Sequence, residues 1–212
     1  AIVFLVEMDF AAMQHAPCAP VIRESARQYY RAAEIGKVLE AVLCACGYAA
    51  RAHYDAHYDV ILPPLAVKAG LGELGRNNIL VADRFGSRVR IGAVTTDCPV
   101  DHDAPVSLGI DRFCEVCRKC ADNCPSHALS DGARVPVRGV GKWPTVPERC
   151  HGYWRQVGTD CGICMAACPF SHPDTVLHRL VRRTVRVAPW LSRPLVRLDD
   201  LFYGRRWKVT GR

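Results

Sequence analysis

The 212-residue sequence predicts an α+β fold followed by a smaller cysteine-rich domain. Two observations support this prediction. Strand-like and helix-like patterns of apolar residues alternate as far as about residue 96, which indicates an α+β core. Eight of the twelve cysteines then gather between residues 114 and 168. We therefore place the core at residues 1–108, the cysteine-rich domain at 109–172, and a basic extension that packs on the core at 173–212.

The core begins with a strand and a long helix. Residues 1–8 are mostly apolar and predict a central strand. Residues 22–46 have the periodicity of an amphipathic helix, which ends at Gly47, the residue type that commonly follows a helix C-terminus. Because the chain starts with Ala1 inside a strand pattern and has no initiator methionine, we expect it to be a fragment that a signal peptide or an N-terminal part of the core precedes.

The remaining core elements are short and are separated by glycine and proline. They are expected as strands at 48–53 and 60–62, a helix at 65–69, a glycine-dense turn at 70–76, and strands at 78–82 and 88–95. The longest apolar run is too short to span a bilayer. The segment 130–147 is expected to be a loop inside the cysteine-rich domain.

The cysteines form two runs that each end in Cys-Pro. Their spacings are Cys114-x2-Cys117-x2-Cys120-x3-Cys124-Pro125 and Cys150-x10-Cys161-x2-Cys164-x3-Cys168-Pro169. A close triplet lets three thiolates reach one cuboidal [4Fe–4S] cluster, and in two-cluster ferredoxins the fourth cysteine ligates the other cluster. We expect each proline to start a helix. The predicted ligand sets are Cys114, Cys117, Cys120 and Cys168 for one cluster, and Cys150, Cys161, Cys164 and Cys124 for the other.

Zinc sites and disulfides are the alternatives for these cysteines. Zinc does not require a triplet followed by x3-Cys-Pro, and still less two of them, so the spacing favours two [4Fe–4S] clusters. The other four cysteines have no partner spacing, and for Cys44 and Cys46, in an apolar helical stretch, we expect small buried residues and no redox role. The four are Cys18, Cys44, Cys46 and Cys98.

The net charge of +7 comes from the C-terminal part of the chain. Residues 1–171 have 18 basic and 18 acidic residues, whereas residues 172–212 have 10 and 3. Arginines recur at helical spacing from Arg179 to Arg186 among apolar residues, which predicts an amphipathic basic helix. This helix is a solvated surface, a docking site for an acidic electron donor, or a contact with an anionic membrane surface. Nucleic acid is disfavoured because no aromatic residues alternate with the arginines.

Two segments that precede the cysteines resemble a known family. Residues 68–78 (KAGLGELGRNN) and 85–97 (FGSRVRIGAVTTD) are similar to segments of the cobalamin-dependent reductive dehalogenases and of the related epoxyqueuosine reductases. The ten-residue gap after Cys150 fits the dehalogenases better. Residues 199–204 (DDLFYG) also look like the end of a dehalogenase.

The resemblance implies a corrinoid-binding core with a nitroreductase-like fold, followed by a ferredoxin-like domain whose two clusters pass electrons to cobalt. It also implies base-off cobalamin, in which no side chain ligates the cobalt, and a small organohalide substrate. The sequence agrees with this, because the Asp-x-His-x-x-Gly motif of other corrinoid proteins is absent. The nearest segment, residues 55–60, has Val60 in place of the required glycine.

The resemblance also implies catalytic residues. Reductive removal of halide consumes a proton, and in the family a tyrosine on a helix supplies it. Tyr29 is the best match and Tyr30 the second, although Gln28 stands where the family has glycine. Arg90, favoured over Arg88, matches the cation that supports this tyrosine.

Other residues are predicted to bind substrate or cofactor. His57 occupies a loop position that holds a catalytic aspartate or an asparagine in relatives, and it is either a second acid or an exposed histidine. The glycine-dense turn lets the backbone approach the corrin or ends a helix. The cofactor-binding candidates are Tyr30, Gly72, Gly75, Arg76, Asn77, Asn78 and Arg155.

The leading hypothesis is a reductive dehalogenase-like oxidoreductase. An epoxyqueuosine reductase acting on a tRNA base and a non-catalytic iron–sulfur electron carrier are the alternatives. The compartment is left open, because the clusters suit a reducing interior, whereas dehalogenases also work outside it after export in folded form.

Overall fold

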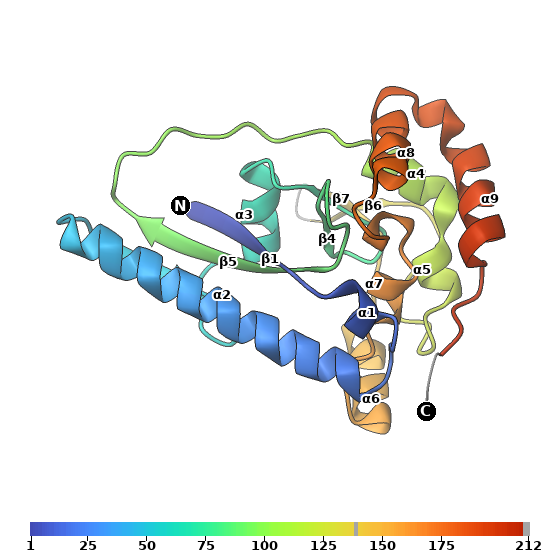
Figure 1. Cartoon of the computed structure of the whole chain (residues 1–212), viewed down its shortest axis with the longest axis horizontal. Coiled ribbons are helices and arrows are strands. Elements are labelled where there is room, and N and C mark those ends of the chain that lie inside the picture. Colours follow the sequence, from blue (N-terminus) through green and yellow to red (C-terminus); the bar gives the residue numbers. More distant parts are fainter. Residues whose placement is uncertain (138–139, 210–212) are drawn as a thin grey trace.

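The computed structural model of the chain describes residues 1–137 and 140–209. A three-stranded sheet lies at one end of the molecule and the cysteine-rich region at the other (Figure 1). The sheet consists of β1 (Ile2–Glu7), β2 (Ala50–His53) and β5 (Val89–Thr96) in the order β1-β5-β2, and both pairings are antiparallel. Within the described sheet β5 is central and β1 is at an edge, so the expectation of a central strand at residues 1–8 is wrong.

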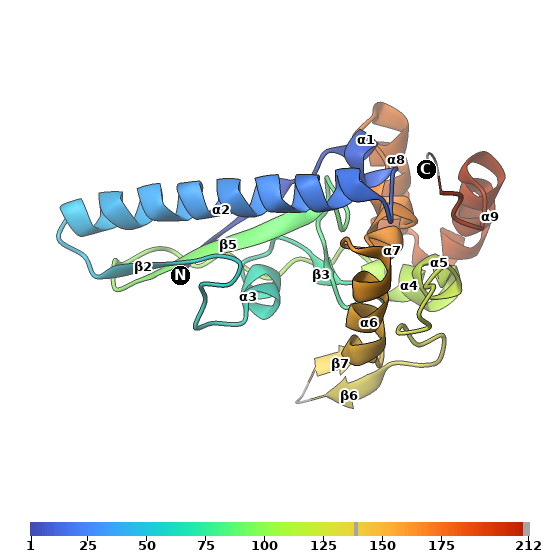
Figure 2. The ribbon, with the colours of Figure 1, turned by 90° about the horizontal axis from the view of Figure 1, so that it is seen from below.

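Helices cover both faces of the sheet, which explains why the edge strand β1 is apolar from Ile2 to Val6. The long helix α2 (Ala19–Ala45) runs along one face and α3 (Leu62–Lys68) lies on the other (Figure 2). The backbone at Gly47, just after α2, has φ of 88°, as expected for a residue that ends a helix. The strand expected at 60–62 is wrong: Leu62 begins α3, since Pro63 and Pro64 occupy a first turn that needs no N–H donors.

Short elements connect the sheet to the cysteine-rich region. Helix α1 (Phe10–Met13) follows β1 and is capped by the Asp9 carboxylate, which accepts from the Ala12 N–H at 2.7 Å. Strands β3 (Glu73–Leu74) and β4 (Leu80–Val81) form a hairpin around the end of the glycine-dense turn. A long segment without regular structure then returns from β5 to the cysteine-rich region (Figure 1).

The cysteine-rich region is mainly helical. The expected loop at 130–147 contains a hairpin, although residues 138–139 lie outside the described residues. Pro169 starts a three-residue 3-10 helix, whereas Pro125 lies in a turn, so only one of the two prolines begins a helical segment. The elements are α4 (Ile110–Cys117), α5 (Lys119–Asp122), β6 (Val135–Val137), β7 (Val140–Lys142), α6 (Pro147–Val157) and α7 (Ile163–Ala166).

The basic extension forms α8 (Val176–Val187), a 3-10 turn at Pro189–Leu191 and α9 (Ser192–Tyr203). Both helices pack on α4, where Val185 and Val196 join a core that includes Phe113. The extension therefore packs mainly on the cysteine-rich region and not on the sheet; residues 210–212 lie outside the described residues. No helix in residues 1–137 and 140–209 is long and apolar enough to span a membrane.

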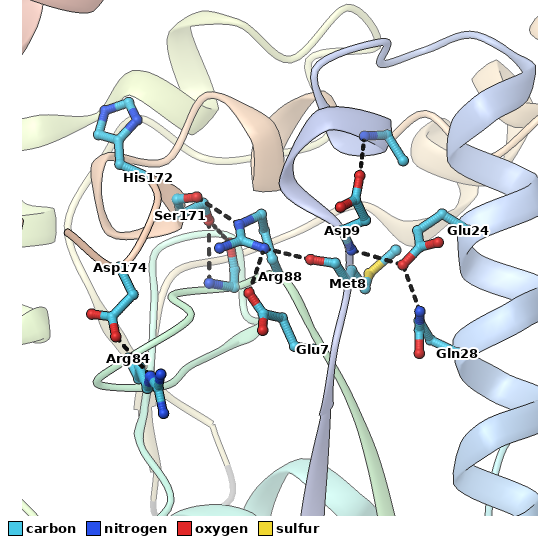
Figure 3. A network of polar contacts seen from close by, with 12 residues as sticks. Glu7, Met8, Asp9, Glu24, Gln28, Arg84, Arg88, Ser171, His172 and Asp174 are labelled. Atoms are coloured by element: carbon cyan, nitrogen blue, oxygen red, sulfur yellow. Dashed lines mark hydrogen bonds and ion pairs between the residues drawn. The ribbon is translucent and has the colours of Figure 1, made fainter.

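Arg88 joins the sheet to the cysteine-rich region (Figure 3). Its side chain is 1% exposed, and Nε donates to the Ser171 carbonyl at 2.6 Å. Its Nη1 donates to the Met8 carbonyl and lies 3.3 Å from the Glu7 carboxylate. These partners lie at the end of β1 and after α7, and the guanidinium also lies over the Phe10 ring of α1, 5.5 Å from its centroid. Arg88 is therefore a structural link, whereas Arg90 lies beside the Tyr29 ring.

Candidate active site

The first set of cysteines lines one cavity. Cys114 and Cys117 lie on α4, and Cys120 lies on α5 after a break at Arg118, whose φ of 59° ends the first helix. Cys168 joins them from the second run, in extended backbone before Pro169. The cavity is lined by Cys114, Cys117, Cys120 and Cys168 together with Arg76, Asn77 and Phe170.

The second set lines a larger cavity of about 430 Å³. One of its cysteines, Cys124, comes from the first run. The other three come from the second run: Cys150 lies on α6, Cys161 directly precedes Gly162, and Cys164 lies on α7. Gly162 has φ of 65°, which turns the chain into α7. The structure thus brings together the same two sets of four that the crossed arrangement predicts.

Burial dominates the chemistry of these thiols. It raises the pKa of Cys117 to about 12 and that of Cys161 to about 11. In the described part of the chain, no three His, Cys, Asp or Glu side chains converge as they would around a single metal ion. The eight thiols instead line two cavities, four at each, which is the number of thiolates that the four irons of a [4Fe–4S] cluster bind.

Tyr29 and Arg90 lie together on the wall of the second cavity. The Arg90 guanidinium from β5 stacks over the Tyr29 ring from α2, with Cζ 4.5 Å from the ring centroid. Arg90 Nη2 donates to the Ser25 hydroxyl at 2.7 Å and lies 3.8 Å from the Asp160 carboxylate. The cavity is lined by these four residues and by the second set of cysteines. A tyrosine, a cation and four thiols thus share one space.

The environment raises the pKa of Tyr29 above its usual value. Burial is the main cause, and the nearby carboxylates Asp55 and Asp160 act in the same direction, whereas Arg90 opposes them. The hydroxyl therefore stays protonated through neutral pH. A protonated hydroxyl is able to donate a proton, and the Arg90 charge beside the ring favours the anion that such a donation would leave.

Three predicted residues lie outside this cavity. The Tyr30 side chain is 67% exposed, because it is next to Tyr29 on α2 and points elsewhere. His57 is exposed, and its ring stacks on Tyr54 with the centroids 5.0 Å apart. Arg155 is exposed on α6, away from the cavity lining.

The glycines of the turn are needed by the protein's own backbone. A Cβ at Gly72 would collide with the Val81 carbonyl, and one at Gly75 would lie 2.9 Å from Val81 Cγ2. Gly70, with φ of 71°, follows the end of α3. Gly72 and Gly75 thus permit close packing within the β3–β4 hairpin. Gly70 ends a helix, which is the alternative that the sequence left open for this turn.

The polar residues of the same turn point toward the cysteine-rich region. Arg76 lines the first cavity, and Asn77 lines both cavities. Asn77 also holds the backbone, because its side-chain oxygen accepts from the Ile79 N–H at 3.2 Å. Asn78 donates to the Trp143 carbonyl at 2.8 Å. The turn therefore joins the β3–β4 hairpin to the walls of both cysteine cavities.

Sequence reasoning missed Ser25 and Asp160. Ser25 precedes Tyr29 by one helical turn, so helical periodicity places both on one face and could have identified it. Asp160 precedes Cys161, and nothing in the sequence signals that its carboxylate would approach Arg90.

Comparison with known proteins identifies the family. Residues 113–172 match the 4Fe-4S dicluster domain. The chain is 33% identical to the tetrachloroethene reductive dehalogenase of Desulfitobacterium hafniense, over 95% of this chain and 38% of that protein. It is 35% identical to the enzyme of the same name from Sulfurospirillum multivorans, over 68% of this chain and 30% of that protein.

Solved structures agree with these relatives. A catabolic reductive dehalogenase matches with a TM-score of 0.90 and 32% identity, over 98% of this chain and 30% of that one. An epoxyqueuosine reductase from Bacillus subtilis has a TM-score of 0.53 at 18% identity, over 83% of this chain and 49% of that one, and so shares the fold alone. The chain spans just over a third of the length of the first curated relative. On this evidence the chain belongs to the reductive dehalogenase family.

Proposed function

We propose that the chain forms the electron-transfer and proton-donating part of an enzyme that reductively cleaves a carbon–halogen bond. One observation carries the proposal: Tyr29, Arg90 and the second set of cysteines line the same cavity. A substrate in that cavity is within reach of a proton donor and next to the predicted electron source. The proposal includes two [4Fe–4S] clusters, base-off cobalamin, a nitroreductase-like core and a small organohalide substrate.

The residues of the cavity suit a corrinoid. Met13, Val21 and Ile79 give it an apolar wall, and the buried Nε of Arg90 has no hydrogen-bond partner in the described structure, which leaves a donor for a bound group. A solved relative is described as carrying out B12-dependent dehalogenation. A reduced corrinoid supplies a strong nucleophile or electron donor, and the side chains of this cavity supply the rest.

Tyr29 and Arg90 have distinct roles in this proposal. Replacement of halogen by hydrogen consumes two electrons and one proton and releases halide. Tyr29 donates its hydroxyl proton to the carbon that loses the halide, and Arg90 stabilises the phenolate that remains. Asp160 and Ser25 hold the guanidinium beside the ring. The two sets of cysteines would hold the clusters, which would supply the electrons one at a time.

The cofactors are tested by anaerobic reconstitution with iron, sulfide and cobalamin, followed by metal analysis and EPR. We expect about eight irons per chain, as two [4Fe–4S] clusters require, and one base-off Co(II) signal. Iron loading without any cobalt binding would favour an electron carrier over a dehalogenase. No iron loading would overturn the cluster assignment.

The proton donor is tested by Tyr29→Phe in the cofactor-loaded protein. This change should abolish dehalogenation and leave the iron content and the cobalt EPR signal unchanged, because Phe keeps the ring that packs beside Arg90. Tyr30→Phe is the matched control and should retain activity, since that side chain is exposed. Full activity in Tyr29→Phe would exclude this tyrosine as the acid.

The ten-residue gap after Cys150 and the greater similarity to dehalogenases favour this function over epoxyqueuosine reduction. The electron-donor protein and the contact of the basic helix with a membrane surface stay predictions. So does a role for His57.

A further inference from the structure

Arg76 is a buried cation whose partners are all neutral. Its side chain is 2% exposed. Nε donates to the Cys114 carbonyl and Nη1 to the Ser130 and Gly132 carbonyls, each at 3.0 Å. Nη2 lies 3.5 Å from the Glu115 carbonyl. The guanidinium also lies over the Trp143 ring, 4.8 Å from its centroid. These contacts satisfy its hydrogens without neutralising its charge.

Two other cations near the cysteine cavities are paired with carboxylates. Lys119, which is 3% exposed, pairs with the Asp199 carboxylate and lies 3.3 Å from Asp200. Arg90 lies 3.8 Å from Asp160. In residues 1–137 and 140–209, Arg76 forms no ion pair with a carboxylate. Isolated buried charges are costly, so the position of this one calls for a negative group nearby.

The negative group that fits is the cluster predicted at the first set of cysteines. Arg76 lines their cavity. An arginine remains protonated in proteins, so the side chain keeps its charge beside these thiols.

We propose that Arg76 raises the reduction potential of the cluster held by Cys114, Cys117, Cys120 and Cys168, so that it is reduced before the other cluster. The proposal rests on the clusters of the proposed function. One electron from a low-potential one-electron reductant converts the oxidised core to the reduced core, with no bond broken and no proton taken up. The cluster gains one negative charge, and a fixed cation in a low-dielectric site favours that state.

Among the described residues, no arginine or lysine without a carboxylate partner lines the cavity of the second set of cysteines. Arg90, which lines this cavity, is close to Asp160, so the net charge of that pair is small. The two predicted clusters therefore differ in their electrostatic surroundings, although their ligands are the same. The first would hold the electron that arrives from the reductant, and the second would transfer it into the Tyr29 cavity.

The test is an EPR-monitored redox titration of the iron–sulfur-loaded chain with dithionite. The variants are Arg76→Gln, which removes the charge, and Ser130→Asp, which adds a carboxylate next to Arg76. Ser130→Asn is the matched control for the second. The Ser130 hydroxyl accepts from the Gly132 N–H at 3.0 Å, and both Asp and Asn keep an acceptor there.

We expect Arg76→Gln and Ser130→Asp to lower one of the two midpoint potentials and to leave the other unchanged, while Ser130→Asn changes neither. If Arg76→Gln fails to retain iron, the comparison of Ser130→Asp with Ser130→Asn tests the proposal by itself. Equal potentials in Ser130→Asp and Ser130→Asn would overturn the role of Arg76. Absence of two reducible clusters in the unmodified chain would overturn the proposed function itself, which is a separate result.

Discussion

At the scale of single residues, three arginines close in sequence or in space differ in function because their partners differ. Arg88 is enclosed by carbonyls and a carboxylate that link two parts of the fold. Arg90 faces a cavity and a tyrosine ring. Arg76 is buried against cysteines with neutral acceptors only. The same side chain is therefore a structural link, a support for an acid, and an electrostatic neighbour of a predicted cluster.

The pKa of Tyr29 should respond to Arg90. Burial raises this pKa and Arg90 lowers it, so Arg90→Met should raise it further. Tyr29 is protonated below its pKa, so it stops being a proton donor as the pH rises through its pKa in the folded protein. Because that pKa is higher in Arg90→Met, the variant should keep its proton up to a higher pH. The measurement is the phenolate absorbance during an alkaline titration, with Tyr29→Phe as the reference. Arg155→Met, an exposed site, should leave the titration unchanged; an unchanged titration in Arg90→Met would contradict the contact.

Ser25 should act through Arg90. Ser25→Ala removes the acceptor for Nη2, and a hydrogen bond to a charged group contributes about 1.5–3 kcal/mol. We expect the free energy of unfolding to fall by an amount of this order and the pKa of Tyr29 to rise as in Arg90→Met. Ser25→Thr should restore both, because it keeps the hydroxyl. A loss of stability without any change in the tyrosine titration would limit Ser25 to a structural role.

The sequence predicted the residues of the cavity only in part. Tyr29, Arg90 and the eight cysteines could be named from the sequence because each lies in a recognisable motif. The structure places all of them around the two cavities. The glycine turn could not be placed from sequence, since a glycine beside a cofactor and a glycine beside its own strand have the same pattern. Asp160 could not be found either, because its proximity to Arg90 depends on where the connection between α6 and α7 lies relative to β5.

At the scale of elements, the β4–β5 connection depends on one glycine. Gly86 has φ of 59°, and a Cβ there would collide with the backbone of Phe170 and Ser171. Gly86→Ala should therefore lower the free energy of unfolding by more than the roughly 1–2 kcal/mol of the left-handed conformation alone. Gly47→Ala is the control, because its φ is also positive and nothing lies within 4 Å. Equal losses, measured by urea denaturation, would contradict the collision.

Most core elements were predictable from periodicity. The long helix and the last strand lie within a few residues of their predicted bounds. The wrong predictions concern short segments. Residues 60–62 resemble a strand until Pro63 and Pro64 are recognised as the start of a helix. Strand β3 and the β6–β7 hairpin are too short to show a period of apolar residues. The position of β1 at an edge was not predictable, since helices on both faces make its sequence as apolar as that of a central strand.

At the scale of the whole molecule, α8 and α9 present apolar side chains to solvent. Leu180, Leu201 and Phe202 are 60%, 78% and 72% exposed. Large exposed apolar patches promote association. We expect the chain to self-associate and the double variant Leu180→Lys, Leu201→Lys to do so less, as measured by sedimentation velocity. Ile61→Lys, at an equally exposed site away from these helices, should have little effect, and an equal reduction there would show that added charge alone is responsible.

Each cysteine cavity has a consequence for the synthesis of the protein. Cys168, close to the end of the second run, belongs to the cavity of the first run, and Cys124 belongs to that of the second. Neither cavity therefore has four thiols until most of the chain has left the ribosome. Iron delivered to the nascent protein would find an incomplete site at each cavity, so the two proposed clusters would be inserted only after Cys164 and Cys168 have emerged, and almost together.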